Sequence, residues 1–511
     1  MLDMLRARRA SFDKPFETIN PPGVDESLTS PILRNRKIIT ALLDVYLDTI
    51  HPNFPFFCER EIWVRWRDGT FPSGPSDYMS LVCMCALSAQ HVGNGALFTD
   101  DIAAAESATL AHDYLHEALR LVPVDFAEPS IDLVRSYGLL ALLGVQSGDR
   151  AMAHKYLGLY HGVCAQYNLH DESKWPSGIG QCETEVRRRV WWAMYRLEVH
   201  TSCVGGSLIR CPEAQTNVGY PSGIHHPPFV PGRDGDYEDW FSGWNATTDL
   251  YRVLEHAVSE FRAKRRPRPS ILQHGGQDGT GTAMTTTKMV MRRLAKIQDE
   301  LLPQFEGASS RSSDSGRNRC GFQASNVLCT LHLARMILCI SDGAGLVSVF
   351  QTARYMMDRM GEIPREYVRA VGSPLLQQLA GVGHMLTAVA RKQGRHGVLS
   401  LADYAELRAV LVSMVDFLAL FNRHYGKIAA AQERLRGEVA DLDARVGRMS
   451  AQDVSAADDS SPSAGEGTGS SEWLPFLNEA EPDGSTEDVL FLSGDLLSAF
   501  TWQDTTPENN A

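Results

Sequence analysis

Residues 187–198 read Arg-Arg-Arg-Val-Trp-Trp-Ala-Met-Tyr-Arg-Leu-Glu, the densest mixture of basic and aromatic residues in the chain. Val190, Met194 and Leu197 recur at helical spacing, and the two tryptophans widen that apolar face. Because neighbouring indoles bury a large apolar area, we expect this helix at the centre of a core. The arginines can contact phosphate, pair with acids of a neighbouring helix or lie along the core edge. Their position beside the aromatics favours a structural role.

Segments on both sides show the same helical spacing of apolar residues, and no segment alternates repeatedly as strands do. We therefore predict an all-α fold: a large multi-helix core with disordered loops and a disordered acidic C-terminal tail. The predicted helical segments are 36–50, 77–92, 102–121, 130–144, 151–167, 183–204, 249–264, 287–302, 324–340, 347–360, 376–393 and 401–449.

Composition limits the class of protein further. The chain has 511 residues, of which 43% are hydrophobic, so a large core can form without disulfide support. Ten cysteines, several of them in apolar segments, fit buried thiols in a reducing compartment. No run of 18 apolar residues occurs, so we expect a soluble intracellular protein with no membrane partner.

The acidic charge is concentrated at one end of the chain. Residues 451–511 hold thirteen acidic residues and no lysine or arginine, whereas residues 1–450 hold 49 residues of each sign. The net charge of −13 therefore belongs to the tail. A body without net positive charge lacks the main source of non-specific nucleic-acid affinity.

Bulky side chains are set among the acids of this tail. Residues 451–471 are too polar to bury and read as a disordered linker. Acidic residues mixed with apolar clusters are typical of an activation segment that folds when its anchors dock into a hydrophobic groove of a transcriptional coactivator. A solubilising tail is the alternative, but three bulky clusters exceed what solubility requires. The predicted anchors are Trp473, Phe476, Phe491, Phe500 and Trp502.

Sequence motifs for catalysis are absent or incomplete. The sequence contains no G-x-G-x-x-G that opens a βαβ unit and no G-x-x-x-x-G-K-[ST] phosphate loop. Residues 144–148 resemble a nucleophile elbow, but Ser147 is displaced by one position from its centre. We therefore predict no catalytic and no cofactor-binding residues, and we do not expect an enzyme.

Metal-binding motifs are equally weak. His112 and His116 stand four residues apart on a predicted helix, but Asp113 occupies the position where zinc hydrolases carry glutamate. His225 and His226 lie in a proline-rich loop without a nearby acid or cysteine pair. Since no Cys-x-x-Cys occurs either, we predict no metal ligands in this chain.

The last predicted helix carries a seven-residue period. Ile428, Leu435, Leu442 and Met449 mark it, and Gln432 interrupts the intermediate apolar series. Three heptads are near the minimum for a coiled coil, so residues 426–450 are either a short coiled coil that pairs two copies through 428–449 or an amphipathic helix packed within the chain.

The order of these features resembles the fungal-specific transcription factor domain, the middle homology region of zinc binuclear-cluster transcription factors. Residues 51–57 (His-Pro-Asn-Phe-Pro-Phe-Phe) look like its opening motif, residues 168–170 resemble its Gly-Leu-His, and residues 187–198 its arginine and double-tryptophan helix. The resemblance covers residues 36–225 and extends loosely to 425. The matching core positions are His51, Pro52, Phe54, Pro55, Arg188, Arg189, Trp191, Trp192, Tyr195, Glu198 and Gly206.

Two departures from the family pattern are small. The family usually has aspartate at Glu198 and Gly-Arg-Pro where this chain has Gly206, Ser207 and Leu208. The third is larger, because the family's DNA-binding module needs six cysteines to hold two zinc ions, and no cysteine precedes Cys58. Zinc would therefore be a cofactor only through a cysteine cluster upstream of this sequence.

The resemblance implies a nuclear transcriptional regulator of a metabolic or secondary-metabolite gene set. The expected layout is a flexible segment 1–35, a regulatory domain 36–425, the helix 426–450 and the activation segment 451–511. DNA would be contacted through that upstream module or indirectly through a partner. A partner-dependent coregulator, or a helical enzyme or ligand-binding protein with an unrelated acidic tail, are the alternatives.

Overall fold

The structure is a computed structural model that describes residues 34–95, 104–124, 128–222, 240–263, 279–308, 310, 312, 315–341, 346–396, 400–421 and 426–458. Over these ranges every regular element is a helix and no strand forms, which confirms the all-α prediction. The predicted activation anchors and the His225–His226 pair lie outside the described residues.

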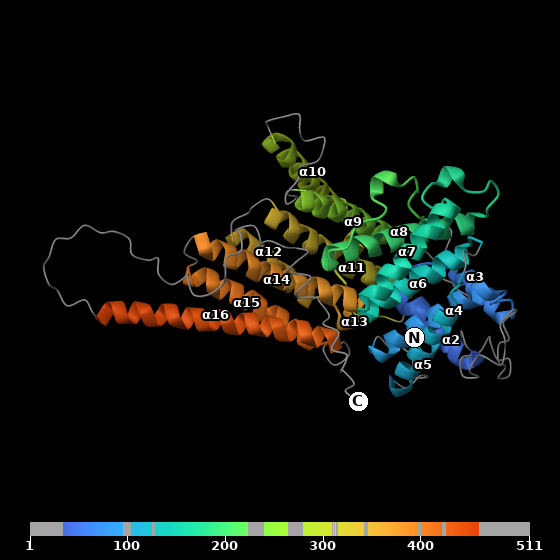
Figure 1. Cartoon of the computed structure of the whole chain (residues 1–511), viewed down its shortest axis with the longest axis horizontal. Coiled ribbons are helices and arrows are strands. Elements are labelled where there is room, and N and C mark those ends of the chain that lie inside the picture. The colour runs from blue at the N-terminus through green and yellow to red at the C-terminus, as the bar shows by residue number, and fades with distance from the viewer. Residues whose placement is uncertain are drawn as a thin grey trace. The chain divides into compact units, whose positions relative to one another are not determined.

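The helices follow one another in the order shown in Figure 1. The α-helices are α2 (Arg36–Val45), α3 (Glu59–Arg67), α4 (Pro75–Gly93), α5 (Ala104–Arg120), α6 (Ile131–Ser147), α7 (Arg150–Tyr167), α8 (Gln181–Gly205), α9 (Trp240–Ala263), α10 (Gly279–Asp299), α11 (Ser315–Ser341), α12 (Leu346–Gly361), α13 (Arg365–Val371), α14 (Ser373–His396), α15 (Leu401–Ala419) and α16 (Gly426–Asp458). Short π- or 3-10 turns are η3 (Tyr46–Ile50), η4 (Glu172–Lys174), η5 (Glu213–Gln215) and η7 (Pro303–Phe305).

The described residues form two compact units. The first takes its residues from within Met1–Cys203, Ser207–Leu338 and Asp358–Leu376, and the second from within Val204–Gly206, Cys339–Met357 and Gln377–Ala511. Residues of the predicted regulatory domain, 36–425, contribute to both units.

In the first unit, α4 lies among α2, α5 and α6. Nearly all of its residues are buried, as expected of a helix without a polar face. Local signals set the neighbouring helix ends: Ser130 caps the start of α6, and Gly148 ends it in the left-handed conformation with φ 69°. Gly138 of α6 lets the chain approach closely, because a Cβ there would lie 3.0 Å from both Phe56 and Met194.

In the second unit, α16 lies along α15 (Figure 1). The predicted heptad positions Ile428, Leu435 and Leu442 are buried within the chain. A Cβ on Gly383 of α14 would lie 2.8 Å from Leu435, so glycine at this position lets α14 approach the stripe closely. This is the packing expected of the intramolecular alternative, and pairing of two copies through the stripe stays a prediction.

Gln432 explains the interruption of the heptad pattern. Its side chain is 1% exposed, and its Nε2 donates a hydrogen bond of 3.0 Å to the backbone oxygen of Val415 on α15. A polar residue at this position therefore fits the contact with α15. The helix also continues to Asp458, beyond the boundary at residue 450 that the sequence predicted.

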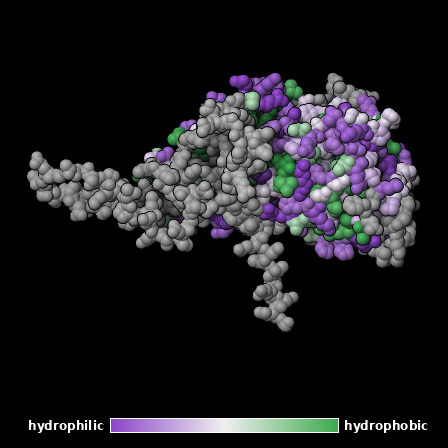
Figure 2. Space-filling model, turned by 45° about the horizontal axis from the view of Figure 1, so that its top comes forward, coloured by the Kyte–Doolittle hydropathy of each residue, from purple (hydrophilic) through white to green (hydrophobic). Residues whose placement is uncertain are grey.

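The described surface on the face turned toward the viewer in Figure 2 is mainly hydrophilic, with small groups of hydrophobic residues between the polar ones. Among the described helices, none combines the length and the apolar character that crossing a bilayer requires.

Replacing Leu435 tests the intramolecular packing of α16. Leu435→Ala removes a fully buried side chain, so we expect a loss of about 2–5 kcal/mol in the free energy of unfolding, measured by chemical denaturation. Arg436→Ala, at the exposed neighbouring position, is the matched control and should change little. Light scattering should give the same molar mass for both variants and the parent. A lower mass for Leu435→Ala alone would show that the stripe pairs two copies.

Candidate functional site

Helix α8 carries the sequence stretch that resembles the family's central motif. Trp191 and Trp192 are 3% and 4% exposed, and Val190 and Met194 are buried with them. Trp192 donates a hydrogen bond from Nε1 to the backbone oxygen of Gly219 at 3.0 Å and packs edge-on against Tyr195. The predicted place of this helix in a core is therefore the observed one.

The arginines of α8 are held by protein groups. Arg187 is 2% exposed, donates hydrogen bonds to Glu183 Oε1 and the Tyr167 hydroxyl, and lies over the Tyr167 ring. Arg188 forms a two-pronged pair with Glu172, at 2.7 and 2.9 Å. Both guanidinium groups are thus engaged within the fold, in the structural role that the sequence favoured.

Arg189 lies deepest of the three. It is 1% exposed and donates from Nε to the backbone oxygen of Glu185 at 3.2 Å and from Nη1 to that of Phe57 at 3.3 Å. Burial lowers the pKa of this guanidinium, because the charged form loses its hydration. Among the described residues, no carboxylate lies within ion-pair distance of Arg189, so backbone oxygens and the face of the Phe241 ring stabilise its charge.

The opening motif, residues 51–57, forms a buried turn that follows η3. His51 is 2% exposed, and its Nε2 donates to the backbone oxygen of Phe57 at 3.0 Å. Burial, followed by the charge of Arg319, lowers the pKa of His51 to about 3. The imidazole is therefore neutral at physiological pH, and a proton on Nε2 makes it a donor to the carbonyl.

Side chains from four helices bind the backbone of this turn. Gln323 of α11 donates to the oxygen of Pro52 at 2.6 Å, and Trp244 of α9 donates to that of Asn53 at 3.1 Å. Arg135 of α6 donates to the backbone oxygen of Phe56, and Arg189 of α8 donates to that of Phe57. The motif residues Phe54 and Pro55 lie between these bonded carbonyls, and Pro55 is buried.

A buried ion pair joins this region to α11. Arg319 Nη2 lies 2.6 Å from Glu59 Oε2, and the two side chains are 3% and 5% exposed. The Arg319 guanidinium also lies 5.6 Å from the centre of the Trp240 ring. Because each charge is costly to bury alone, the pair acts as a unit.

The end of α8 is organised by Tyr195 and Glu198. The Tyr195 hydroxyl donates to Glu255 Oε2 of α9 at 2.6 Å. Glu198 is buried and accepts bonds from the backbone nitrogens of Arg210 and Cys211, while His161 Nε2 lies 3.1 Å away. Burial by itself raises the pKa of Glu198, but His161 and Arg210 outweigh it, so the pKa lies below its usual value.

Gly206 comes directly after α8, where the chain turns with φ 68°. Glycine adopts this left-handed conformation without strain, which accounts for its place in the motif. The carboxylate of Glu198 binds the segment that follows, since it also accepts from Arg210 Nη1 at 3.1 Å. The glutamate that replaces the family's usual aspartate therefore anchors the chain leaving α8.

Two of the weaker motifs, Ser147 and the His112–His116 pair, lie within the described residues. Ser147 ends α6 and donates its hydroxyl to the backbone oxygen of Leu143 at 2.8 Å, so it is not a nucleophile on an elbow. His112 and His116 lie exposed on α5, and no third ligand gathers near them among the described residues. Burial raises the pKa values of Cys83 and Cys85, which makes both thiols inert.

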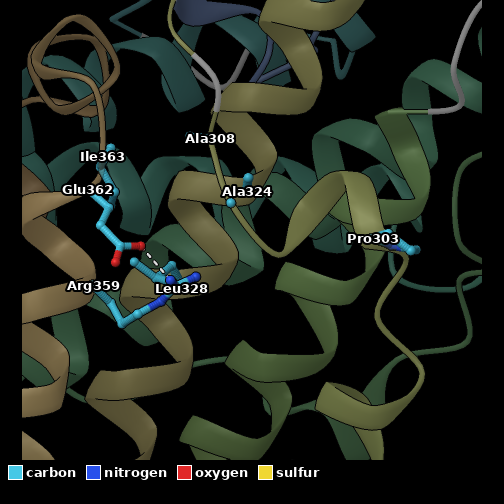
Figure 3. Close-up of a pocket in the computed structure, with 8 residues that line it drawn as sticks. Pro303, Ala308, Ala324, Leu328, Arg359, Glu362 and Ile363 are labelled. Atoms are coloured by element: carbon cyan, nitrogen blue, oxygen red, sulfur yellow. Dashed lines mark hydrogen bonds and ion pairs between the residues drawn. The ribbon is translucent and has the colours of Figure 1, made fainter.

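A small pocket of about 370 Å³ lies beside α11 (Figure 3). Ala324, Leu328 and Ile363 give it an apolar lining, and Arg359 and Glu362 point toward each other at its edge. Arg359 also donates to the backbone oxygen of Glu306 at 2.7 Å. Because its guanidinium is engaged by protein oxygens, the pocket presents no uncompensated charge to an ionic ligand.

The sequence did not reveal which side chains bind the motif residues. Glu59, Trp244, Glu255 and Arg319 complete the network, yet they lie far along the chain from the residues they bind. The proline-rich motif gave one signal that such partners exist. The carbonyl oxygens of a buried turn need side-chain donors.

Comparison with known proteins identifies this arrangement. Residues 43–226 match the family model described as the fungal specific transcription factor domain. This part of the chain is similar to a fungal transcription factor domain. The chain is also similar to transcription factor macR of Penicillium terrestre, with 23% identity over 159 residues, and to zinc finger protein grt1 of Schizosaccharomyces pombe, with 25% identity over 172 residues.

These matches cover part of each protein. They span 30% and 33% of this chain, and 18% of macR and 25% of grt1. The fungal transcription factor domain accounts for the opening turn, helix α8 and the segment that binds Glu198, all of which fall within residues 43–226.

The buried ion pair of the domain gives a test of its packing. Arg319→Met leaves Glu59 charged and buried without this partner, so we expect a loss of about 3–5 kcal/mol in the free energy of unfolding. Adding Glu59→Gln to Arg319→Met should restore part of the lost free energy of unfolding. Arg293→Met breaks an exposed pair with Asp249 and should cost less than about 1 kcal/mol. Equal losses for Arg319→Met and Arg293→Met, measured by urea denaturation, would contradict this role.

Buried histidines predict a loss of stability in acid. Burial lowers the pKa of His51 to about 3 and those of His91 and His200 to about 4, whereas unfolded histidine titrates near 6.5. The unfolded state therefore binds more protons below that pH, and stability falls as the pH decreases from about 6.5 toward 4. Each histidine should cost about 2 kcal/mol at pH 5 relative to pH 7.

The variant His51→Gln keeps a donor for Phe57 but cannot titrate. Between pH 7 and pH 5, its free energy of unfolding should fall by about 2 kcal/mol less than that of the parent. His112→Gln, at an exposed position of α5, is the control for the histidine-to-glutamine exchange itself. Identical pH dependence in His51→Gln and the parent would show that His51 does not titrate on unfolding as its burial requires.

Proposed function

We propose that this protein is a nuclear transcriptional activator whose acidic C-terminal segment recruits coactivators. The match of residues 43–226 to the fungal transcription factor domain carries the proposal. The names of the two relatives, a transcription factor and a zinc finger protein, support the same class. Regulation of a metabolic or secondary-metabolite gene set is part of the proposal and rests on the family resemblance.

The chemistry of the domain supports a regulatory role rather than catalysis. The carboxylates that could act in acid–base catalysis form hydrogen bonds within the fold instead. Glu198 binds the segment after α8, and Glu255 accepts hydrogen bonds from Tyr195 and from the backbone of Glu213. Arg187 and Arg189 are buried and cannot reach a phosphate backbone. In this proposal the domain therefore regulates, and contact with DNA belongs to a zinc-cluster module or to a partner.

The distribution of charge supports the proposed role of the tail. All of the net negative charge lies in residues 451–511, and the five proposed anchors stand among these acids in the sequence. A hydrophobic groove on a coactivator would bury those anchors, and the acids would speed the encounter with a basic surface.

A reporter assay tests the activation segment. Residues 451–511 fused to a heterologous DNA-binding domain should activate transcription of a reporter in yeast. Replacing Trp473, Phe476, Phe491, Phe500 and Trp502 with alanine should abolish activation, because the groove-binding side chains are lost while the charge is kept.

The matched control replaces five serines of the same segment, Ser460, Ser461, Ser463, Ser470 and Ser471, with alanine. This variant should activate as well as the parent at equal protein level on an immunoblot. If the aromatic variant activates as strongly as the serine variant, the anchors do not recruit the coactivator. If the parent segment is inactive, the activator proposal is wrong.

A further inference from the structure

Two cysteines and a glutamate from distant parts of the sequence meet beside the opening motif. Cys58 is the N-cap of α3, Glu61 lies in the first turn of that helix, and Cys182 lies in the first turn of α8. Their ligand atoms all lie within 4.8 Å of one another, and Cys182 Sγ is 3.6 Å from Glu61 Oε2. Among the described residues, this is the one group of three potential metal ligands.

A buried positive charge lies next to these thiols. Arg189 is 1% exposed, and its Nη2 has no hydrogen-bond partner among the described residues. Its charge acts on the thiols of Cys58 and Cys182. With both thiols and Glu61 ionised, three negative charges and one positive charge would leave the group at −2, which one divalent cation neutralises.

We propose that Cys58, Cys182 and Glu61 bind a zinc ion. Two thiolates and one carboxylate match the ligand types that Zn²⁺ accepts, at distances of about 2.3 Å for sulfur and 2.0–2.2 Å for oxygen. The described separation of the ligand atoms requires small side-chain movements to reach these distances. Because Glu61 is half exposed, water has access to the fourth position.

A metal explains the group better than a redox switch does. The third group of the cluster is the carboxylate of Glu61, which takes no part in forming a disulfide but is a common type of zinc ligand. Zinc displaces the thiol protons as it binds, and its affinity should therefore increase with pH.

The ion would fasten α3 to α8. Cys58 directly follows Phe57, whose backbone oxygen accepts from both His51 and Arg189. Zinc at this point would hold the end of the opening motif against the start of α8. Metal binding would then stabilise the folded domain by an amount that increases with the logarithm of the free zinc concentration once this exceeds the dissociation constant.

Titration of the full-length protein with Co²⁺ tests the site. The protein is stripped with a chelator under reducing conditions, and thiolate-to-cobalt charge transfer is followed in the near-ultraviolet. We expect one equivalent of Co²⁺ to give this absorption, Zn²⁺ to displace it, and the thermal midpoint to rise on adding Zn²⁺. Circular dichroism confirms that each variant keeps its helix content.

Three variants separate the site from other metal binding. Cys182→Ser should abolish the charge-transfer band, and Glu61→Gln, at an exposed position, should weaken zinc affinity by more than about tenfold. Cys211→Ser is the matched control, because Cys211 is also half-buried but lies outside the group. Its affinity should equal that of the parent.

The proposal fails if the parent shows no charge-transfer band with excess Co²⁺, or if Cys182→Ser and Glu61→Gln bind as tightly as Cys211→Ser. It also fails if the parent binds no metal and peptide mapping finds a disulfide between Cys58 and Cys182, since the pair would then be a redox site. These outcomes are independent of the reporter assay, which concerns the acidic tail.

Discussion

The buried turn of residues 51–57 imposes the constraint on which the first unit depends. Its prolines prevent the backbone from continuing as a helix, so carbonyl oxygens lie in the core without helical partners. Gln323, Trp244 and Arg189 each donate a side-chain hydrogen bond to one of them. Because an unpaired buried carbonyl is costly, the turn determines which side chains its neighbouring helices must present.

This constraint also accounts for the charged residues in the core. Arg189 and Arg319 are placed where they serve the opening turn or an adjacent acid, and aromatic rings cover their faces. Arg196 follows the same principle without an acid, since it lies 4.7 Å from the Trp244 ring centre and burial lowers its pKa to about 10. Aromatic rings from outside residues 187–198, such as Tyr167, Phe241 and Trp244, therefore help the fold to bury the arginines of α8.

The sequence predicted the structural features that depend on residues close to one another in the chain. Apolar spacing predicted most of the helices, but it missed the short helices α3 and α13 and joined α15 and α16 into one segment. The aromatics next to Arg187 and Arg189 predicted that these arginines are structural. Contacts between distant segments carried no such signal: nothing near Cys58 indicates that Cys182 approaches it. The buried Gln432 shows the same limit. A polar residue in this apolar stripe is explained only by its hydrogen bond to the backbone oxygen of Val415, which lies on another helix.

Two kinds of binding chemistry divide between the ends of this chain. Within the described residues, Arg188 and Glu198 are engaged by protein groups and are therefore unavailable to a ligand or to DNA. Residues 451–511 contain no basic residue with which their acids could pair locally. In the proposed function, the charges and aromatic side chains of that segment are the groups that a coactivator would bind. A metal that ties α3 to α8 beside the opening turn would act on the body alone, because its ligands belong to the same network as Arg189.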